Sequence, residues 1–171
     1  MRILREWLGL SAEQEASGGD TIRRIADELD RLEPARARYL ASFAFVLARL
    51  AHADHEVSDV ELTTMESLVA TKGGVTPDQA ALVVHMARTQ QKLFGGTDDF
   101  LVTRELEKSA TYDQKLALID CLFAVASSDD RLLTVEGNEI ARIGRELKVE
   151  QSDLSRLRAG YRKFIEASKG L

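Results

Sequence analysis

The chain has 171 residues, of which 44% are hydrophobic and 30% are charged, as in ordinary soluble globular proteins. This length allows one substantial core and is short for two independent ones. The net charge of −5 and the lack of a basic stripe argue against nucleic acid as a partner.

Two further features of the sequence predict a cytoplasmic protein. No run of apolar residues approaches the roughly 18 that a transmembrane helix needs, and Met1–Leu10 lacks the continuous apolar centre of a secretory signal. Cys121 is the single cysteine, which excludes an internal disulfide and favours a reducing compartment.

The N-terminal residues 1–19 are predicted to stand apart from a single helical domain over residues 20–171. Residues 11–19 are polar and form a flexible connector. Residues 1–10 form a short amphipathic segment that either docks on the domain or makes weak contact with a membrane surface, at the inner face of the membrane. Its apolar face consists of Ile3, Leu4, Trp7 and Leu8.

Start and stop signals divide the domain into about eight helices. A first helix stops at Pro34, which suits the opening of the next helix because its missing N–H is no loss there. That second helix ends near Asp54, and a capping box at Ser58 begins a third. Gly73 and Gly74 end the third helix, as glycines past a helix terminus often do.

The second part of the domain carries similar signals. Thr76–Gln79 and Thr111–Gln114 each place a threonine cap three residues before a glutamine, and Thr97 opens a shorter helix between them. Ser152 and Asp153 are predicted to cap the last helix. No segment has a convincing strand pattern, so the predicted fold is all-α.

A repeat relates the two parts of the domain. Residues 47–61 and 122–136 align without a gap at an offset of 75 residues. In each segment an apolar helix runs into Ala-Asp or Ser-Asp, followed by an apolar residue three positions after the Asp and a Glu seven after it. This pattern predicts two similar helical hairpins about a pseudo-two-fold axis, with halves at about 35–74 and 111–149.

The apolar positions of the two halves also correspond. The matched pairs are Leu50 with Val125, Met65 with Ile140 and Leu68 with Ile143. The centre of the core is predicted to contain Phe43, Leu47, Leu50, Ile119, Leu122 and Phe123.

Four carboxylates of the repeat are the candidate functional residues. A pseudo-two-fold axis would bring Asp54 and Glu61 close to Asp129 and Glu136, and hard cations such as calcium, magnesium or manganese bind such oxygens. A structural explanation stays open, because a Glu three residues after Ser58 is a normal capping-box member and Asp is common in turns.

Three further residues are candidate metal ligands. His52 and His55 are three positions apart and lie beside the first carboxylates, and Asp130 occupies the corresponding turn of the second half. Imidazole with carboxylate suits several transition metals. The alternative is that both histidines are exposed turn residues, because the second half offers Ser127 in place of His52.

No catalytic or organic-cofactor motif occurs in the sequence, so we expect a protein that is not an enzyme. Cys121 lies between apolar residues of a predicted core helix and has no CxxC partner. It is predicted to act as a small buried hydrophobe, with a reactive thiol as the alternative.

The repeated Ala-Asp and Ser-Asp motifs resemble the TerB family, named for bacterial tellurite-resistance operons, over about Ala41–Val149. The resemblance is best in Phe45–Glu61 and Leu118–Glu136. It implies an all-helical bundle of two related halves, no enzymatic activity, and a metal site built from the motif Asp and Glu residues. This chain departs from the common Asp-Gly of the family, with His55 and Asp130 after the two motif aspartates.

The resemblance also implies a role in a stress-response system that includes membrane partners. The leading hypothesis is a stress-response module of the tellurite-resistance type that binds a divalent cation and links it to partner proteins. The main alternative is a metal-independent scaffold whose acidic surface docks a partner. A third hypothesis, an oxyanion-detoxifying enzyme, is disfavoured by the lack of a catalytic motif.

Overall fold

The computed structural model describes residue 24 and residues 27–50, 59–88, 99–128 and 134–163. Within these residues every regular element is a helix, which confirms the predicted all-α fold. None of the described helices is long and apolar enough to cross a membrane. The predicted segment at residues 1–19 lies outside the described residues.

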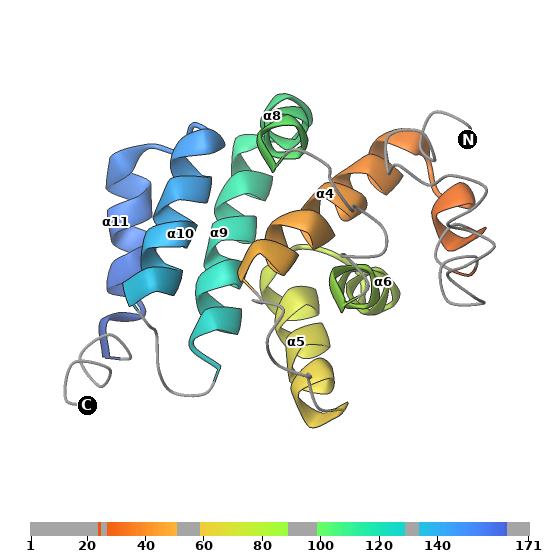
Figure 1. Cartoon of the computed structure of the whole chain (residues 1–171), viewed down its shortest axis with the longest axis horizontal. Helices are drawn as coiled ribbons and strands as arrows, with labels where there is room; N and C mark the ends of the chain where they lie inside the picture. The colour runs from red at the N-terminus through yellow and green to blue at the C-terminus, as the bar shows by residue number, and fades with distance from the viewer. Residues whose placement is uncertain (1–23, 25–26, 51–58, 89–98, 129–133, 164–171) are drawn as a thin grey trace.

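Figure 1 shows the described helices, labelled in chain order. A helical stretch at residues 27–30 precedes them. Their bounds are α4 Pro34–Leu50, α5 Asp59–Lys72, α6 Pro77–Arg88, α8 Asp99–Ser109, α9 Tyr112–Ala126, α10 Thr134–Glu146 and α11 Gln151–Ala159.

The predicted capping boxes set the starts of α6 and α9. Thr111 Oγ1 accepts the backbone N–H of Gln114 at 3.1 Å, and the Gln114 side chain accepts the Thr111 N–H at 2.9 Å. Thr76 and Gln79 make the same reciprocal pair before α6, at 3.2 and 3.3 Å. Both pairs satisfy N–H groups that the first helical turn leaves without partners.

The start of α11 differs from the prediction. The helix begins at Gln151 with Glu150 as its N-cap, and no side chain caps it, so Ser152 and Asp153 lie inside the first turn. The backbone N–H of Glu150 instead donates to the hydroxyl of Tyr112 at 3.0 Å. A tertiary contact therefore fixes this helix start in place of a local cap.

Glycine ends α5 as predicted. The N–H of Gly73 donates to the Val69 carbonyl at 2.9 Å, and Gly74 follows with a φ of 69°. A residue with a Cβ adopts this left-handed conformation at a cost, so glycine is the natural choice.

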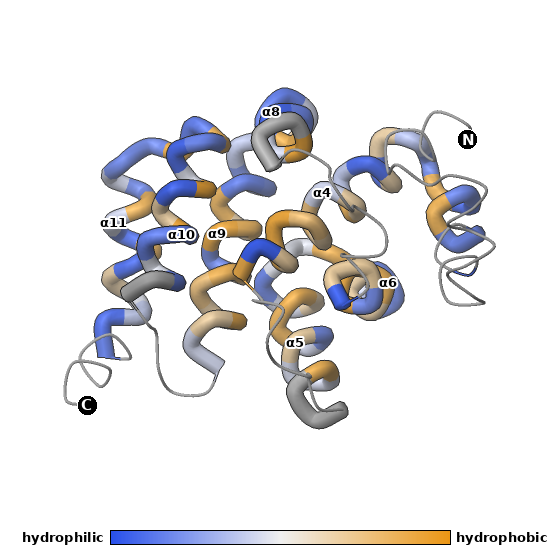
Figure 2. Tube along the Cα trace, in the orientation of Figure 1, coloured by the Kyte–Doolittle hydropathy of each residue, from blue (hydrophilic) through white to orange (hydrophobic). Residues whose placement is uncertain are grey.

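One core occupies the space between α4, α6 and α9, and α4 is its central element. Every side chain from Tyr39 to Ala48 is buried, so this stretch of α4 is covered on all sides. Figure 2 shows the corresponding apolar colouring along α9 and the middle of α4, whereas α11 is largely hydrophilic. The six predicted core residues are all buried: Phe43, Leu47, Leu50, Ile119, Leu122 and Phe123.

The repeat extends to three helices in each half. Moving α4, α5 and α6 by 75 positions gives residues 109–125, 134–147 and 152–163. The observed helices α9, α10 and α11 cover nearly the same residues. In both halves the third helix packs against the first two, and α8 connects the halves.

The contacts between the halves are reciprocal. The second helix of the first half, α5, packs on α9, and the second helix of the other half, α10, packs on α4. The two first helices, α4 and α9, also contact one another. Of the matched pairs, Leu50 and Ile140 are buried while Val125 and Met65 pack against the core at its edge. The correspondence is incomplete, because α10 also packs on α9, whereas the equivalent helices α5 and α4 are not in close contact within the described residues.

Candidate functional site

The structure describes two of the four motif carboxylates by backbone position. Glu61 and Glu136 are each the third residue of a helix, α5 and α10 respectively, as the repeat requires. Glu136 is half-buried in the first turn of α10. The other predicted site residues lie outside the described residues: His52, Asp54, His55, Asp129 and Asp130.

Convergence of the carboxylates therefore stays a prediction. Within the described residues, no group of three or more His, Cys, Asp or Glu side chains is arranged to hold a metal ion. In Figure 1 the N-terminal ends of α5 and α10 and the C-terminal end of α9 all point toward the lower edge of the view. The C-terminal end of α4, by contrast, lies near the middle of the molecule, beside α9.

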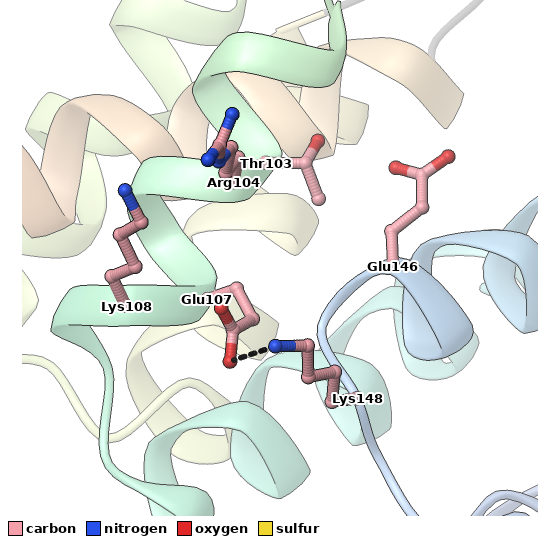
Figure 3. Close-up of a pocket in the computed structure, with 6 residues that line it drawn as sticks. All are labelled: Thr103, Arg104, Glu107, Lys108, Glu146 and Lys148. Atoms are coloured by element: carbon pink, nitrogen blue, oxygen red, sulfur yellow. Dashed lines mark ion pairs between the residues drawn. The ribbon is translucent and has the colours of Figure 1, made fainter.

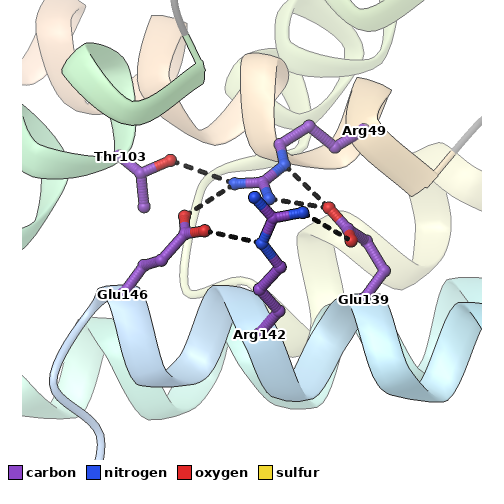
Figure 4. A network of polar contacts seen from close by, with 5 residues as sticks. All are labelled: Arg49, Thr103, Glu139, Arg142 and Glu146. Carbon is purple, nitrogen blue, oxygen red and sulfur yellow. Dashed lines mark hydrogen bonds and ion pairs between the residues drawn. The ribbon is translucent and has the colours of Figure 1, made fainter.

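A network centred on Arg49 lies next to these motifs (Figure 4). The guanidinium of Arg49, in the last turn of α4, binds Glu139 through Nε at 3.0 Å and Nη2 at 2.6 Å. Its Nη1 donates to Glu146 at 2.9 Å and to the hydroxyl of Thr103 at 3.2 Å. Arg142 contacts both glutamates from the solvent side, at 3.9 and 3.2 Å. The network joins α4, α8 and α10.

The Arg49 side chain is 5% exposed, so its charge depends on these carboxylates. Burial by itself would lower the pKa of Arg49, but hydrogen bonds to Glu146 and Glu139 outweigh burial and raise the pKa above its usual value. Arg49 is therefore a permanent cation held by two carboxylates. A guanidinium suits this position because its fixed fork of donors reaches several acceptors at once.

The network connects the flanks of the two repeats. Arg49 lies in the last turn of α4, five residues before Asp54, and Glu139 follows Glu136 by three residues, about one turn. The bond between them fixes the last turn of α4 against the first half of α10. This contact was not predicted, although an arginine within a strongly apolar stretch of a helix is a signal for a buried ion pair.

The single cysteine of the chain lies in α9. Cys121 is fully buried, and burial raises the pKa of its thiol to about 12, with Asp120 adding to the effect. The thiolate is the reactive form, so the thiol is inert at neutral pH. This agrees with the predicted role as a small buried hydrophobe. Nearby, the Tyr161 hydroxyl donates to Asp120 Oδ1 at 2.8 Å, and Lys72 Nζ lies 3.5 Å from Oδ2.

Within the described residues, the buried hydroxyl of Tyr39 lacks a hydrogen-bond partner. Burial raises the pKa of this hydroxyl. Arg36 lies over its ring at 5.3 Å from the centroid, and Phe43 stacks beside it. The aromatic surface of Tyr39 thus has partners although its hydroxyl has none.

The fold and the motif positions define a class of all-α domain made of two related three-helix units with an acidic residue at matching helix starts. The chain belongs to the TerB family: the family described as "Tellurite resistance protein TerB" matches residues 39–159, from the first part of α4 to the end of α11. This match confirms the resemblance found in the motifs. No curated protein and no solved structure gives a match.

Proposed function

We propose that this protein is a non-enzymatic module of the tellurite-resistance type that binds a divalent cation between its two repeats. The observation that carries the proposal is the common offset of 75 residues in the helices, which gives Glu61 and Glu136 the same position in α5 and α10. Asp54 and Asp129 precede these glutamates by the same seven residues. Calcium, magnesium and manganese are the ions whose preference for oxygen ligands such carboxylates meet.

The Arg49 network supports the proposal because it draws the flanks of the two motifs together. A site shared by two segments requires that the segments keep a fixed separation, and an ion pair between Arg49 and Glu139 restrains them. Two glutamates, Glu139 and Glu146, supply the counter-charge of Arg49. Arg49 thus has its counter-charges within the network.

The link to partner proteins is the second part of the proposal. We infer that cation binding changes the surface that the acidic turns present, and that stress-response proteins, including membrane-associated ones, recognise this surface. The expected cytoplasmic location also stays a prediction. The alternative function is a metal-independent scaffold that uses the same acidic surface to dock its partner.

Thermal unfolding with and without calcium, magnesium or manganese tests the metal proposal. A cation that binds only the folded protein stabilises it by mass action, by about 2.7 kcal/mol at a concentration of 100 Kd. The double variant Asp54→Asn/Asp129→Asn should lose this response. It should also be at least as stable as the metal-free parent, because two mutually repelling charges are removed.

The control is Asp78→Asn/Asp113→Asn, which removes two exposed carboxylates from the first turns of α6 and α9. This variant should keep the full metal response. A parent protein with no metal-dependent shift would favour the scaffold. A strongly destabilised Asp54→Asn/Asp129→Asn variant would mean that these aspartates form turns and caps.

A further inference from the structure

A cavity of about 270 Å³ lies between α8 and the C-terminal end of α10 (Figure 3). It is open to solvent, and none of its lining residues is one of the predicted metal ligands. Charged side chains dominate its wall. The lining residues are Thr103, Arg104, Glu107, Lys108, Glu146 and Lys148.

Both carboxylates of the wall already have cationic partners. Glu107 Oε1 lies 3.6 Å from the Nζ atoms of both Lys115 and Lys148. Glu146 is bound by the Arg49 network. Glu107 faces two lysines, and the two arginines beside Glu146 balance Glu146 and Glu139 together. Neither glutamate of the wall therefore gives the cavity a net negative charge.

Two cationic side chains of the wall have no carboxylate partner among the described residues. Arg104 and Lys108 are exposed, lie one turn apart on α8, and make no ion pair in the described part of the chain. Two like charges at this spacing destabilise a helix slightly, so helix stability does not explain why both residues are basic. Although the protein has a net charge of −5, the wall of this cavity carries an excess of positive charge.

The backbone at Lys148 is a second, independent feature of the cavity. Lys148 has a φ of 59°, and it is the one residue other than glycine with a positive φ in the described part of the chain. The N–H of Val149 donates to the Gly144 carbonyl at 2.9 Å, which makes Lys148 the residue where a helix usually ends in glycine. A lysine here accepts backbone strain, and its side chain reaches the cavity wall.

We propose that this cavity binds a phosphate monoester group. Its volume is below the range typical of drug-sized ligands, so it suits a small group better than a large ligand. A phosphate monoester carries about −1.5 to −2 charge at neutral pH, which matches the two uncompensated cations. The arginine adds a planar fork that binds phosphate oxygens in pairs. The group belongs either to a free metabolite or to a phosphorylated residue of a partner protein.

Titration of the ¹⁵N-labelled full chain with inorganic phosphate, followed by amide chemical shifts at constant ionic strength, tests the proposal. We expect saturable shifts confined to α8 and to the turn after α10. The same shifts with chloride at equal ionic strength, or shifts spread over exposed cations such as Arg88, would overturn it.

Lys148→Gly separates binding from folding. Glycine adopts the left-handed conformation without strain, so the variant should be at least as stable as the parent. Its affinity for phosphate should fall about three- to fivefold, as expected for the loss of one exposed charge contact. Arg104→Gln/Lys108→Gln should abolish saturable binding. The matched control Arg88→Gln removes one exposed charge from α6 and should bind phosphate as the parent does.

Parental affinity in Lys148→Gly or in Arg104→Gln/Lys108→Gln would overturn the proposal. A short peptide with one phosphoserine, titrated beside inorganic phosphate, identifies the source of the group. Tighter binding of the peptide indicates a phosphorylated partner, and tighter binding of inorganic phosphate indicates a free metabolite.

Discussion

At the scale of single residues, Arg49 decides how the two halves are held together beside the predicted site. Its guanidinium joins α4 to α8 and α10 and is almost completely buried. A buried ion pair contributes little net stability compared with apolar packing, but removal of one partner leaves the other charge uncompensated. Removal of one member of the network should therefore lower the free energy of unfolding strongly. Replacement of all its charged residues by apolar ones should lower it less.

Arg49→Ala should lower the free energy of unfolding by about 2–3 kcal/mol, somewhat below the range for a fully buried pair because Glu139 and Glu146 are each about a quarter exposed. Arg49→Lys should cost about 1 kcal/mol, because an ammonium keeps the charge and cannot reach both carboxylates as a fork does. Urea unfolding measures both. An Arg49→Ala variant within about 0.5 kcal/mol of the parent would place Arg49 among ordinary surface residues.

Tyr112 makes a hydrogen bond to Asp153 whose contribution to stability depends on pH. Its hydroxyl donates to Asp153 Oδ2 at 2.6 Å and accepts the Glu150 N–H at 3.0 Å. The bond from Tyr112, with a second from Arg156, lowers the pKa of Asp153 below its ordinary value of 3.8. A lowered pKa in the folded state means that the contact stabilises the protein above about pH 4 and that this stabilisation is lost as the pH falls further.

Tyr112→Phe should therefore melt at a lower temperature than the parent at pH 7, and the difference should shrink toward pH 3 as Asp153 becomes protonated. Thermal unfolding of both proteins at the two pH values measures the change. A difference that is constant over this range would show that the Glu150 N–H bond, which does not titrate, accounts for the whole effect.

At the scale of elements, α10 and α11 pack closely because α10 carries glycine where α11 crosses it. A Cβ at Gly144 would overlap Leu154 Cδ2 and lie 3.1 Å from Cδ1. At Gly137 the nearest atom would be Arg158 Nη2 at 3.3 Å, at the end of a flexible side chain. The two glycines lie in one helix and differ mainly in what surrounds them.

This difference predicts opposite signs for the same substitution. Gly137→Ala should stabilise the protein by about 0.5–1 kcal/mol, since alanine is the better helix former and Arg158 has room to move. Gly144→Ala should be destabilising by about 1–2 kcal/mol, because overpacking against buried Leu154 exceeds that gain. Urea unfolding of the two variants compares them directly. Shifts of equal size and sign would mean that α11 moves away freely.

Helices with local signals were predictable from the sequence, and contacts between distant residues were not. The reciprocal bonds of Thr111 and Gln114 span three residues, so the motif alone predicts the start of α9. The start of α11 depends on the Tyr112 hydroxyl, which is distant in sequence from Glu150. The Ser152 and Asp153 prediction was therefore wrong, because a local rule cannot include this contact.

The same distinction applies to the candidate site. The motif spacing predicted the matching positions of Glu61 and Glu136, since both follow from helix periodicity and the repeat. The Arg49 pair with Glu139 joins residues 90 positions apart and required the packing of α10 on α4. A buried arginine is visible in the sequence as a charge inside an apolar helix, whereas its partners are fixed only by the tertiary fold.

At the scale of the whole molecule, the two halves share one core. The reciprocal packing of α5 on α9 and of α10 on α4 means that each half completes the cover of the other. Leu47 and Leu122 occupy equivalent positions of the repeat and are both fully buried. A shared core of this kind predicts that neither half unfolds alone, so the protein should unfold in a single cooperative transition.

Leu47→Ala and Leu122→Ala test this cooperativity with one substitution in each half. Each variant should lower the free energy of unfolding by about 2–5 kcal/mol, because both side chains are enclosed and the cavity left behind collapses only in part. In calorimetry each should shift one transition whose calorimetric and van't Hoff enthalpies agree. If Leu122→Ala instead split the transition, leaving one component at the melting temperature of the parent, the halves would be separate folding units. The cation site proposed between them would then lack the rigid frame that a shared core provides.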